Sequence, residues 1–198
     1  MKTRILAFLL AFSCLFCLSA CSESEDPSAN FSRGTFSDGV YTNSFAGISL
    51  ALSEDWQIYS DEAIEEMYGS VTTSDENGKM LTCYDFVAVR EDGTSVTVTY
   101  SDLDAFYGGG IGEKEYLESA LELLRSEMEN AYGSCVCEMG EVSLSGKTVP
   151  CISSVIKQNG SEIFNSVVVK KTGTVMASLS VAALSEEAAE EVFSRLIL

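Results

Sequence analysis

Histidine is absent from the 198-residue sequence. Catalytic sites of the Ser–His–Asp or Cys–His type need an imidazole to accept the nucleophile's proton, so both types are excluded. The usual zinc sites depend on imidazole as well and are excluded with them. No phosphate-binding loop followed by a lysine and no EF-hand spacing is present either. These absences favour a function other than catalysis.

Positive charge is also scarce. The chain has 12 Lys and Arg against 30 Asp and Glu, and two of the cations, Lys2 and Arg4, lie in an N-terminal stretch without acids. The remaining residues carry ten cations and thirty acids, a formal net charge of −20. Phosphate binding needs clustered Lys and Arg, so nucleic acid is a poor partner, and direct binding to anionic lipid is disfavoured. Repulsion of like-charged polymers and attraction of cations stay open.

Long apolar runs are missing apart from one at the start. Residues 5–18 are apolar except Ser13 and follow the two cations. Such a run is too short to span a bilayer and is typical of a signal peptide. Leu18-Ser19-Ala20-Cys21 comes next and resembles the bacterial lipobox. That resemblance implies cleavage before Cys21 and a diacylglycerol on its thiol, whereas an ordinary signal peptide or an uncleaved anchor is the alternative.

The lipobox resemblance sets the expected location and organisation. It implies a protein anchored through Cys21 to the cell membrane on its extracytoplasmic side. The surface of a Gram-positive cell is expected from the second resemblance, given below for residues 41–56. Residues 1–20 are then the signal peptide. We interpret residues 21–38 as an acidic tether, because their first part is polar and has too little apolar surface to fold. Residues 39–198 form a single domain.

Within that domain the apolar pattern predicts strands, turns and three helices. Asp92-Gly93 indicates a two-residue hairpin that would pair Val89 with Val96. Residues 81–89 are apolar on both faces, which is typical of a central strand covered on two sides. The predicted elements are strands at 40–43, 48–52, 81–90 and 95–100, helices at 61–68 and 113–132, four strands joined at residues 145–146, 159–160 and 172–173, and a final helix from Ser185 through Ile197.

Turns this short require antiparallel neighbours. We therefore predict an α+β fold in which a central antiparallel sheet is flanked by helices on both faces, as a three-layer sandwich. The spacing of Tyr41, Asn43, Gly47, Ile48 and Trp56 resembles the opening of short lipoproteins from clostridia-like bacteria, although Ser53 replaces their usual proline. Those domains are similar to the PsbP-like (Mog/PsbP) fold. The resemblance implies the same sandwich but no binding residue.

Four cysteines follow the lipidation site: Cys83, Cys135, Cys137 and Cys151. An even number in an exported protein permits one or two disulfides, and buried thiols are the alternative. Cys135 and Cys137 would share one face of a strand. An ideal turn at residues 145–146 would place Cys151 opposite Gly140 on the other face, and a one-residue bulge would reverse this. A redox pair or thiolate metal site is the less favoured interpretation.

Three aspartates suggest a weak cation site. Asp85, Asp102 and Asp104 could supply oxygen ligands to Ca²⁺, and no other cofactor is indicated. Residues 106–112 are rich in glycine, and we interpret them as a helix entry because no lysine follows them. The preferred hypothesis is a non-enzymatic module that binds a protein, an envelope component or a small ligand. An accessory lipoprotein that binds Ca²⁺ or another cation is the alternative.

Overall fold

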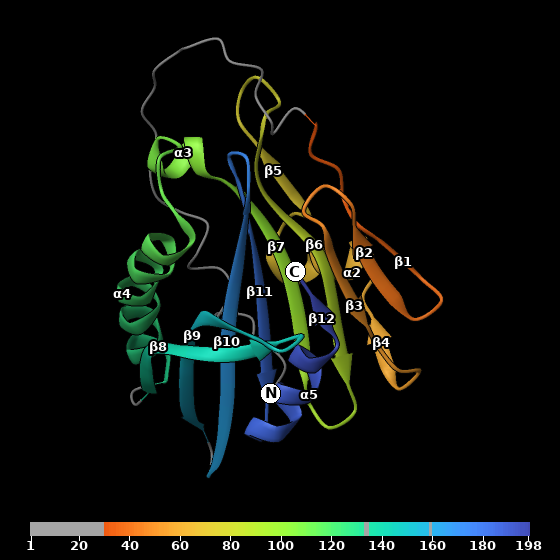
Figure 1. Ribbon diagram of the computed structural model, residues 1–198, viewed down its shortest axis with the longest axis vertical. Coiled ribbons are helices and arrows are strands. Elements are labelled where there is room, and N and C mark those ends of the chain that lie inside the picture. The colour runs from red at the N-terminus through yellow and green to blue at the C-terminus, as the bar shows by residue number, and fades with distance from the viewer. Residues whose placement is uncertain (1–29, 133–134, 159) are drawn as a thin grey trace.

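The computed structural model describes residues 30–132, 135–158 and 160–198 (Figure 1). The predicted signal peptide, the predicted lipobox, Cys21 and half of the predicted tether lie outside these ranges. Strands make up 49% of the described residues and helices 25%. Within this part of the chain, no helix is both long enough and apolar enough to cross a membrane.

The elements follow the turn and capping signals of the sequence. Ser60 caps the first described helix by accepting a hydrogen bond from the backbone of Ala63, and Gly69 ends it in the left-handed conformation. The helices are α2 (Asp61–Tyr68), α3 (Leu103–Tyr107), α4 (Glu113–Tyr132) and α5 (Glu186–Ser194). The strands are β1 (Thr35–Ser37), β2 (Val40–Asn43), β3 (Ile48–Ala51), β4 (Trp56–Ile58), β5 (Thr72–Ser74), β6 (Met80–Arg90), β7 (Ser95–Asp102), β8 (Cys135–Leu144), β9 (Lys147–Gln158), β10 (Ser161–Thr172), β11 (Val175–Ala183) and β12 (Leu196–Ile197).

The large sheet has eight antiparallel strands. Its order is β4-β6-β7-β11-β10-β9-β8, with β5 paired to β6 beside β4. The hairpin turn after Leu144 is tight, with Ser145 and Gly146 both at positive φ, and it places Cys151 opposite Gly140. The next hairpin pairs Ile156 with Ile163. Both pairings confirm the predictions made from the turns.

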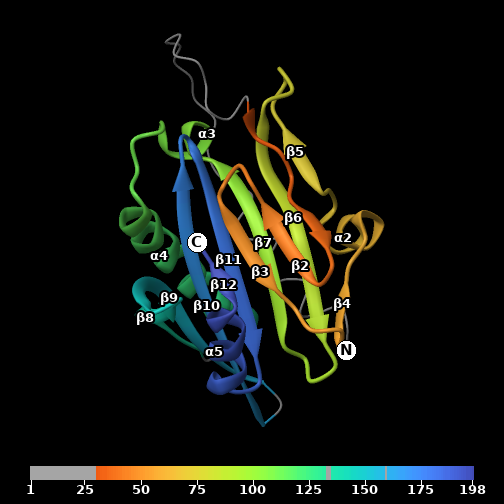
Figure 2. The ribbon, with the colours of Figure 1, turned by 45° about the vertical axis from the view of Figure 1, so that its right-hand side comes forward.

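The small sheet lies across one face of the large sheet, as the turned view shows (Figure 2). Its order is β1-β2-β3-β12. Tyr41, Ile48 and Leu50 from the small sheet meet Val96 and Val98 from β7 in the main hydrophobic core, to which α5 also contributes. All five side chains are almost fully buried. Burial of this apolar area is the main stabilising contribution of the interface.

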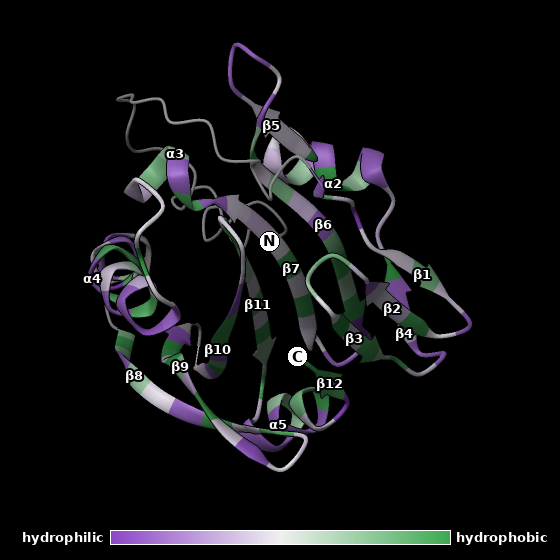
Figure 3. Cartoon of the chain, turned by 45° about the horizontal axis from the view of Figure 1, so that its top comes forward, coloured by the Kyte–Doolittle hydropathy of each residue, from purple (hydrophilic) through white to green (hydrophobic). Residues whose placement is uncertain are grey.

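Helices cover the opposite face of the large sheet at its two sides. Ile64 of α2 packs near Tyr84 and Val87 of β6. Leu117 and Met128 of α4 pack on β8, β9 and β10. Strands β7 and β11 run between the two helices (Figure 3), so no helix of the described residues lies directly over the middle of this face.

The predicted helix-flanked sandwich is therefore wrong: the fold is rich in β structure, with two sheets. A central strand that is apolar on both faces needs two covering layers, but either layer can be a sheet. Here β1, β2, β3 and β12 supply one of them. The C-terminal helix was also predicted too long, because α5 ends at Ser194 and Leu196–Ile197 pairs with β3.

The register predicted at Asp92-Gly93 is also wrong by one residue. Val96 pairs with Ala88, and Val89 pairs with Ser95. The Gly93 backbone donates to the Arg90 carbonyl, and the Arg90 backbone donates to the Thr94 carbonyl. Gly93 has a φ of +87°, so residues 91–93 form a three-residue loop that ends in a left-handed glycine, and this loop shifts the strands by one residue relative to a two-residue loop.

The folded part begins before the predicted boundary at residue 39. Phe31 packs on Phe45 and Tyr100, with ring centroids 5.5 and 5.1 Å apart. Residues 35–37 form β1, which pairs with β2. Residues 30–38 contain few apolar side chains, so their composition does not indicate that they are folded. One aromatic ring, that of Phe31, and the edge strand β1 attach this stretch to the domain.

Candidate ligand-binding groove

A groove lies between α4 and the large sheet, and its floor comes from the alternation of β7. Val96, Val98 and Tyr100 point into the main core, so Thr97 and Thr99 point to the opposite face. Strand β11 alternates in the same way and presents Ser178 and Ser180. The floor of the groove is therefore a patch of small hydroxyl side chains.

Strand register brings these hydroxyls into adjacent rows. Thr99 lies between Tyr84 on β6 and Ser178 on β11. In the neighbouring rows, Thr97 pairs with Ser180, and Ser101 pairs with Thr82. Cross-strand neighbours have Cβ atoms about 5 Å apart, so hydroxyls from three strands form one continuous surface.

The walls of the groove are mostly apolar. Leu117, Ala120 and Leu124 recur at helical spacing on the face of α4 that looks onto the floor. Ile152 of β9 and Val167 of β10 close the side beneath the helix. The enclosed volume is about 80 Å³, and the groove opens to solvent along part of its length.

Polar contacts fix the start of α4 above the sheet. The Glu113 carboxylate accepts a hydrogen bond of 2.8 Å from the Lys171 backbone on β10. The Lys171 side chain donates to the carbonyls of Gly109 and Ile111 in the segment that enters the helix. Glu115 also accepts from the Gly112 backbone. The segment that enters the helix is thus held to β10 by the Glu113 carboxylate and the Lys171 ammonium group.

Several of the hydroxyls are already used inside the protein. Ser180 donates to the Asn165 side chain at 2.8 Å, and the Asn165 amide donates to Ser154. Burial raises the pKa of Tyr116, whose hydroxyl lies among Ser178 and Ser101, so Tyr116 stays protonated at neutral pH. Within the described residues, the side chains of Thr82 and Thr99 make no hydrogen bond and face the groove.

Charge is missing from the described residues that line the groove, although the chain has thirty acids. The lining also holds no cysteine. A surface of hydroxyl and apolar groups suits an uncharged ligand, because a buried charge without a partner is costly. The described lining of the groove thus combines small hydroxyl groups with apolar side chains.

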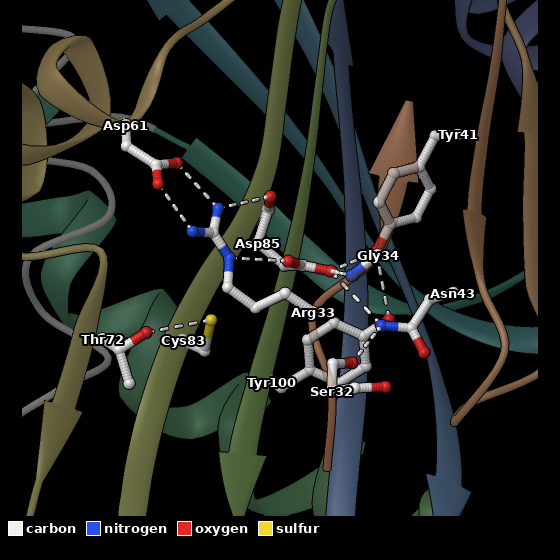
Figure 4. Close-up of polar contacts among 10 residues, drawn as sticks. All are labelled: Ser32, Arg33, Gly34, Tyr41, Asn43, Asp61, Thr72, Cys83, Asp85 and Tyr100. Atoms are coloured by element: carbon white, nitrogen blue, oxygen red, sulfur yellow. Dashed lines mark hydrogen bonds and ion pairs between the residues drawn. The ribbon is translucent and has the colours of Figure 1, made fainter. Parts of the chain in front are cut away.

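Asp85 lies on the other face of β6, at the centre of a buried polar network (Figure 4). Its carboxylate accepts from the Tyr41 hydroxyl at 2.6 Å, the Gly34 backbone at 2.7 Å and Arg33 Nε at 3.0 Å. Asn43 Nδ2 lies at 3.3 Å. The Asp85 side chain has no exposed surface, so these donors replace the water that the carboxylate loses.

A β-bulge explains how Asp85 reaches that network. Tyr84 pairs with Thr99 and Phe86 with Val98, so Asp85 is an extra residue on β6. Burial, with Tyr100 and Asp85 nearby, raises the pKa of Tyr41 far above its usual value, and Tyr41 acts as a fixed donor. The network joins the entering segment at Arg33 and Gly34 to the central strand, which is a structural role.

Arg33 extends the network to the surface. Its guanidinium donates to both carboxylate oxygens of Asp61 on α2, at 2.7 and 2.8 Å. The same side chain holds Asp85, so one arginine links the entering segment, β6 and α2. The hydrogen bonds from Arg33 lower the pKa of Asp61.

The three aspartates predicted to bind Ca²⁺ are not brought together as one site. Asp85 is bound by Arg33, whereas Lys79 Nζ lies 2.7 Å from Asp102 and 3.6 Å from Asp104. Asp102 also caps α3 by accepting from the Asp104 backbone. Among residues 30–132, 135–158 and 160–198, no group of three or more Cys, Asp and Glu side chains is placed to hold a metal.

The four described cysteines are free thiols. Cys151 points into the main core, whereas Cys137 packs under α4 on the opposite face of the sheet. Cys83 lies on β6, on the core side. Burial raises the pKa of Cys83, Cys137 and Cys151 to about 11, so these thiols are poor nucleophiles at neutral pH.

Sequence reasoning missed the groove, although a signal was present. The alternation Thr97-x-Thr99-x-Ser101 and the pair Ser178-x-Ser180 place small hydroxyls on one face of two strands. That these strands are neighbours depends on β11 returning to pair with β7. Hairpin turns indicate only which consecutive strands pair, so they do not indicate that β11 pairs with β7.

Comparison with known proteins gives distant structural likenesses. The sequence matches no family model and no curated protein. LpqN, described as involved in cell envelope biogenesis of Mycobacterium tuberculosis, has 13% identity and a TM-score of 0.39, over 75% of this chain and 81% of LpqN. A Bacteroides thetaiotaomicron protein has 15% identity and a TM-score of 0.37, over 83% of this chain and 47% of its own. PA94 of Pseudomonas aeruginosa, described as a putative regulator, has 11% identity and a TM-score of 0.36, over 84% and 98%.

The chain thus spans about half of the Bacteroides protein and most of the other two. None of these three is described as a PsbP-like protein, so the PsbP-like resemblance of the opening motif stays a prediction. Likenesses at this level identify neither a family nor a ligand.

Proposed function

We propose that this protein is a membrane-anchored extracytoplasmic lipoprotein whose domain binds a ligand in the groove between α4 and the large sheet. The observation that carries the proposal is the groove lining itself. It combines an apolar wall with the unpaired hydroxyls of Thr82 and Thr99, and none of its described residues is charged. Such a lining can desolvate and orient an uncharged ligand.

Binding without catalysis is the proposed activity. The groove offers hydroxyls as its nucleophiles, but among its described lining residues no carboxylate, amine or thiol is present to accept their protons. Burial raises the pKa of Tyr116, so its hydroxyl is protonated at neutral pH and offers no phenolate to act as a base. A Ca²⁺-binding role has less support, since the nearest cations to Asp85, Asp102 and Asp104 are Arg33 and Lys79.

Anchoring is proposed from the N-terminal sequence. The apolar run, the small residues and Cys21 follow one another in the order of a lipoprotein signal. Two acyl chains on Cys21 would give stable attachment, because each buried methylene contributes about 0.8 kcal/mol. Because the mature chain has a net charge of −20, an anionic membrane would repel it, and the acyl chains would have to provide the attachment.

Radiolabelled palmitate tests the anchor. We expect the label to enter the wild-type chain and Cys21→Ala to abolish it, with the variant released into the medium or left unprocessed. Cys135→Ala is the matched control, because it removes a thiol of the folded domain and should leave labelling unchanged. Equal labelling of wild type and Cys21→Ala would refute anchoring at residue 21.

Photo-crosslinking in intact cells tests the groove. A benzophenone amino acid is placed at Leu124, which lines the groove, or at Ser126, which is exposed on the same helix. We expect an adduct at position 124 that is absent at position 126. Ala120→Phe, which fills the groove from the helix side, should suppress the adduct. Adducts of equal yield at both positions, or none at position 124, would refute ligand binding in the groove.

A further inference from the structure

We infer that the groove binds the alkyl chain of an uncharged, single-chain amphiphile whose neutral oxygen atoms meet the hydroxyls of the floor. This inference names the ligand class for the proposed binding function and rests on it. It is carried by the size of the groove, its apolar wall, the missing charge and the two unpaired threonines.

The size of the groove favours a slender ligand. Its volume of about 80 Å³ exceeds what a water molecule needs, about 10–15 Å³. It falls below the roughly 300 Å³ at which pockets for whole drug-sized molecules begin. A groove of that size, open to solvent along part of its length, holds part of a chain while the rest of the molecule stays in solvent.

The wall favours an alkyl chain over a polar one. Most of the surface exposed within the groove is apolar, and Leu117, Ala120 and Leu124 present successive turns of one helix to it. A row of apolar side chains along α4 matches the length of an extended chain, and removing both surfaces from water drives association. A polar polymer would lose its hydration against this wall without compensation.

The charges around the groove exclude an ionised head group. Lys171 and Lys79 lie near the end at which Ser101 and Met176 pair. Lys171 is held by the carbonyls of Gly109 and Ile111, and Lys79 by Asp102. A carboxylate would therefore lack a cationic partner, and the strongly negative chain would repel it. An ammonium group would find no carboxylate among the described lining residues.

The threonines explain why the ligand should carry oxygen. The Thr99 hydroxyl lies at the middle of the floor, between Tyr84 and Ser178, and Thr82 lies in the next row beside Ser101. Each can donate to an ester or ether oxygen and accept from an alcohol. A pure hydrocarbon would bury these hydroxyls without a partner, which a neutral oxygen-bearing chain avoids.

Binding of 1-decanoylglycerol tests the inference. The mature chain, residues 21–198 with Cys21→Ala, is titrated below the micelle concentration and followed by native mass spectrometry. Decanoate and decyltrimethylammonium are the charged controls. We expect a one-to-one complex with decanoylglycerol whose affinity is at least tenfold higher than with either ion. Equal or tighter binding of decanoate, or no binding of decanoylglycerol, would overturn the inference.

Matched variants locate the binding. Leu124→Glu places a charge in the apolar wall, and Ser126→Glu places the same charge on the exposed side of α4. We expect the first to weaken decanoylglycerol binding at least tenfold and the second to leave it within twofold, with melting temperatures recorded for both. Equal losses in the two variants would overturn the assignment to the groove.

Thr99→Val is a second variant that keeps the shape of the floor and removes a hydroxyl. We expect a threefold to tenfold loss of decanoylglycerol affinity, the range for one hydrogen bond, and no loss would overturn the role of Thr99. The crosslinking at Leu124 separates the two proposals. An adduct there without decanoylglycerol binding refutes the ligand class alone, whereas the absence of both refutes the binding function.

Discussion

Replacing Asp85 tests whether the buried network holds the N-terminal segment to the domain. Asp85→Asn preserves the size of the side chain, but its amide nitrogen cannot accept a hydrogen bond. Gly34 and Tyr41 donate to one carboxylate oxygen, and Arg33 Nε donates to the other. The variant therefore leaves at least one buried donor unpaired, whichever way the amide is turned.

The expected loss follows from the burial of the carboxylate. An unpaired buried donor costs about 1–3 kcal/mol, and removing one member of a buried ion pair costs about 3–5 kcal/mol. Arg33 keeps Asp61 and is 36% exposed, which places the total near the lower value. We expect the free energy of unfolding to fall by about 3 kcal/mol. At about 2–4 °C per kcal/mol for a chain of this size, the melting temperature falls by about 6–12 °C.

Urea unfolding followed by Trp56 fluorescence measures this loss. Asp61→Asn is the matched control, because it removes the other carboxylate bound by Arg33 and its side chain is 56% exposed. Exposed ion pairs contribute about 1 kcal/mol or less. A loss in Asp85→Asn no larger than in Asp61→Asn would refute the reasoning, because burial would then not distinguish the two carboxylates.

Three further predictions concern single positions. Hydrogen bonds from Arg90 lower the pKa of Asp92 to about 2, so its carboxylate stabilises the fold above pH 4 and this stabilisation is lost as the pH falls toward 2. Asp92→Asn should remove that pH-dependent contribution, which is about 1 kcal/mol or less at a half-exposed site. If the free energy of unfolding in urea changed equally between pH 5 and pH 2 in the wild type and in Asp92→Asn, the prediction would be contradicted. Iodoacetamide should modify Cys135 before the more buried Cys83, Cys137 and Cys151, as read by peptide mass spectrometry, and equal rates in the native protein would contradict their burial. Gly93→Ala should cost about 1–2 kcal/mol of unfolding free energy because of its positive φ, whereas Gly110→Ala, with open space around it, should be close to neutral. Equal effects would contradict the left-handed glycine of the three-residue loop.

Local features of the fold could be predicted from the sequence because their causes are local. The start of α2 follows from the Ser60 cap, and α4 follows from apolar residues at helical spacing. The pairing of Ile156 with Ile163 follows from the turn between them. At Asp92-Gly93 the same reasoning gave the wrong register, because a glycine at positive φ occurs both in two-residue and in three-residue hairpin loops.

Features that depend on distant segments could not be predicted. Whether β2 and β3 join the central sheet or cover it is decided by the packing of Tyr41, Ile48 and Leu50 on β7. The short strand at Leu196–Ile197 forms because β3 offers an open edge. Asp85 was considered as an oxygen ligand, but its true partner, Arg33, lies 52 residues away in a segment interpreted as tether. Similarly, the groove exists because β11 pairs with β7.

The attachment of Arg33 and Gly34 to Asp85 decides where a mechanical load would enter the domain. If Cys21 carries the lipid as proposed, the twelve residue steps to Arg33 form a leash of at most about 40 Å. Tension on that segment would first reach Phe31, which packs on Phe45 and Tyr100, and then the middle of β6 through Asp85, before it could peel β1 from β2. The hydrogen bonds to the buried Asp85 carboxylate, rather than those of an edge strand, would then resist a force that pulls the domain away from its anchor.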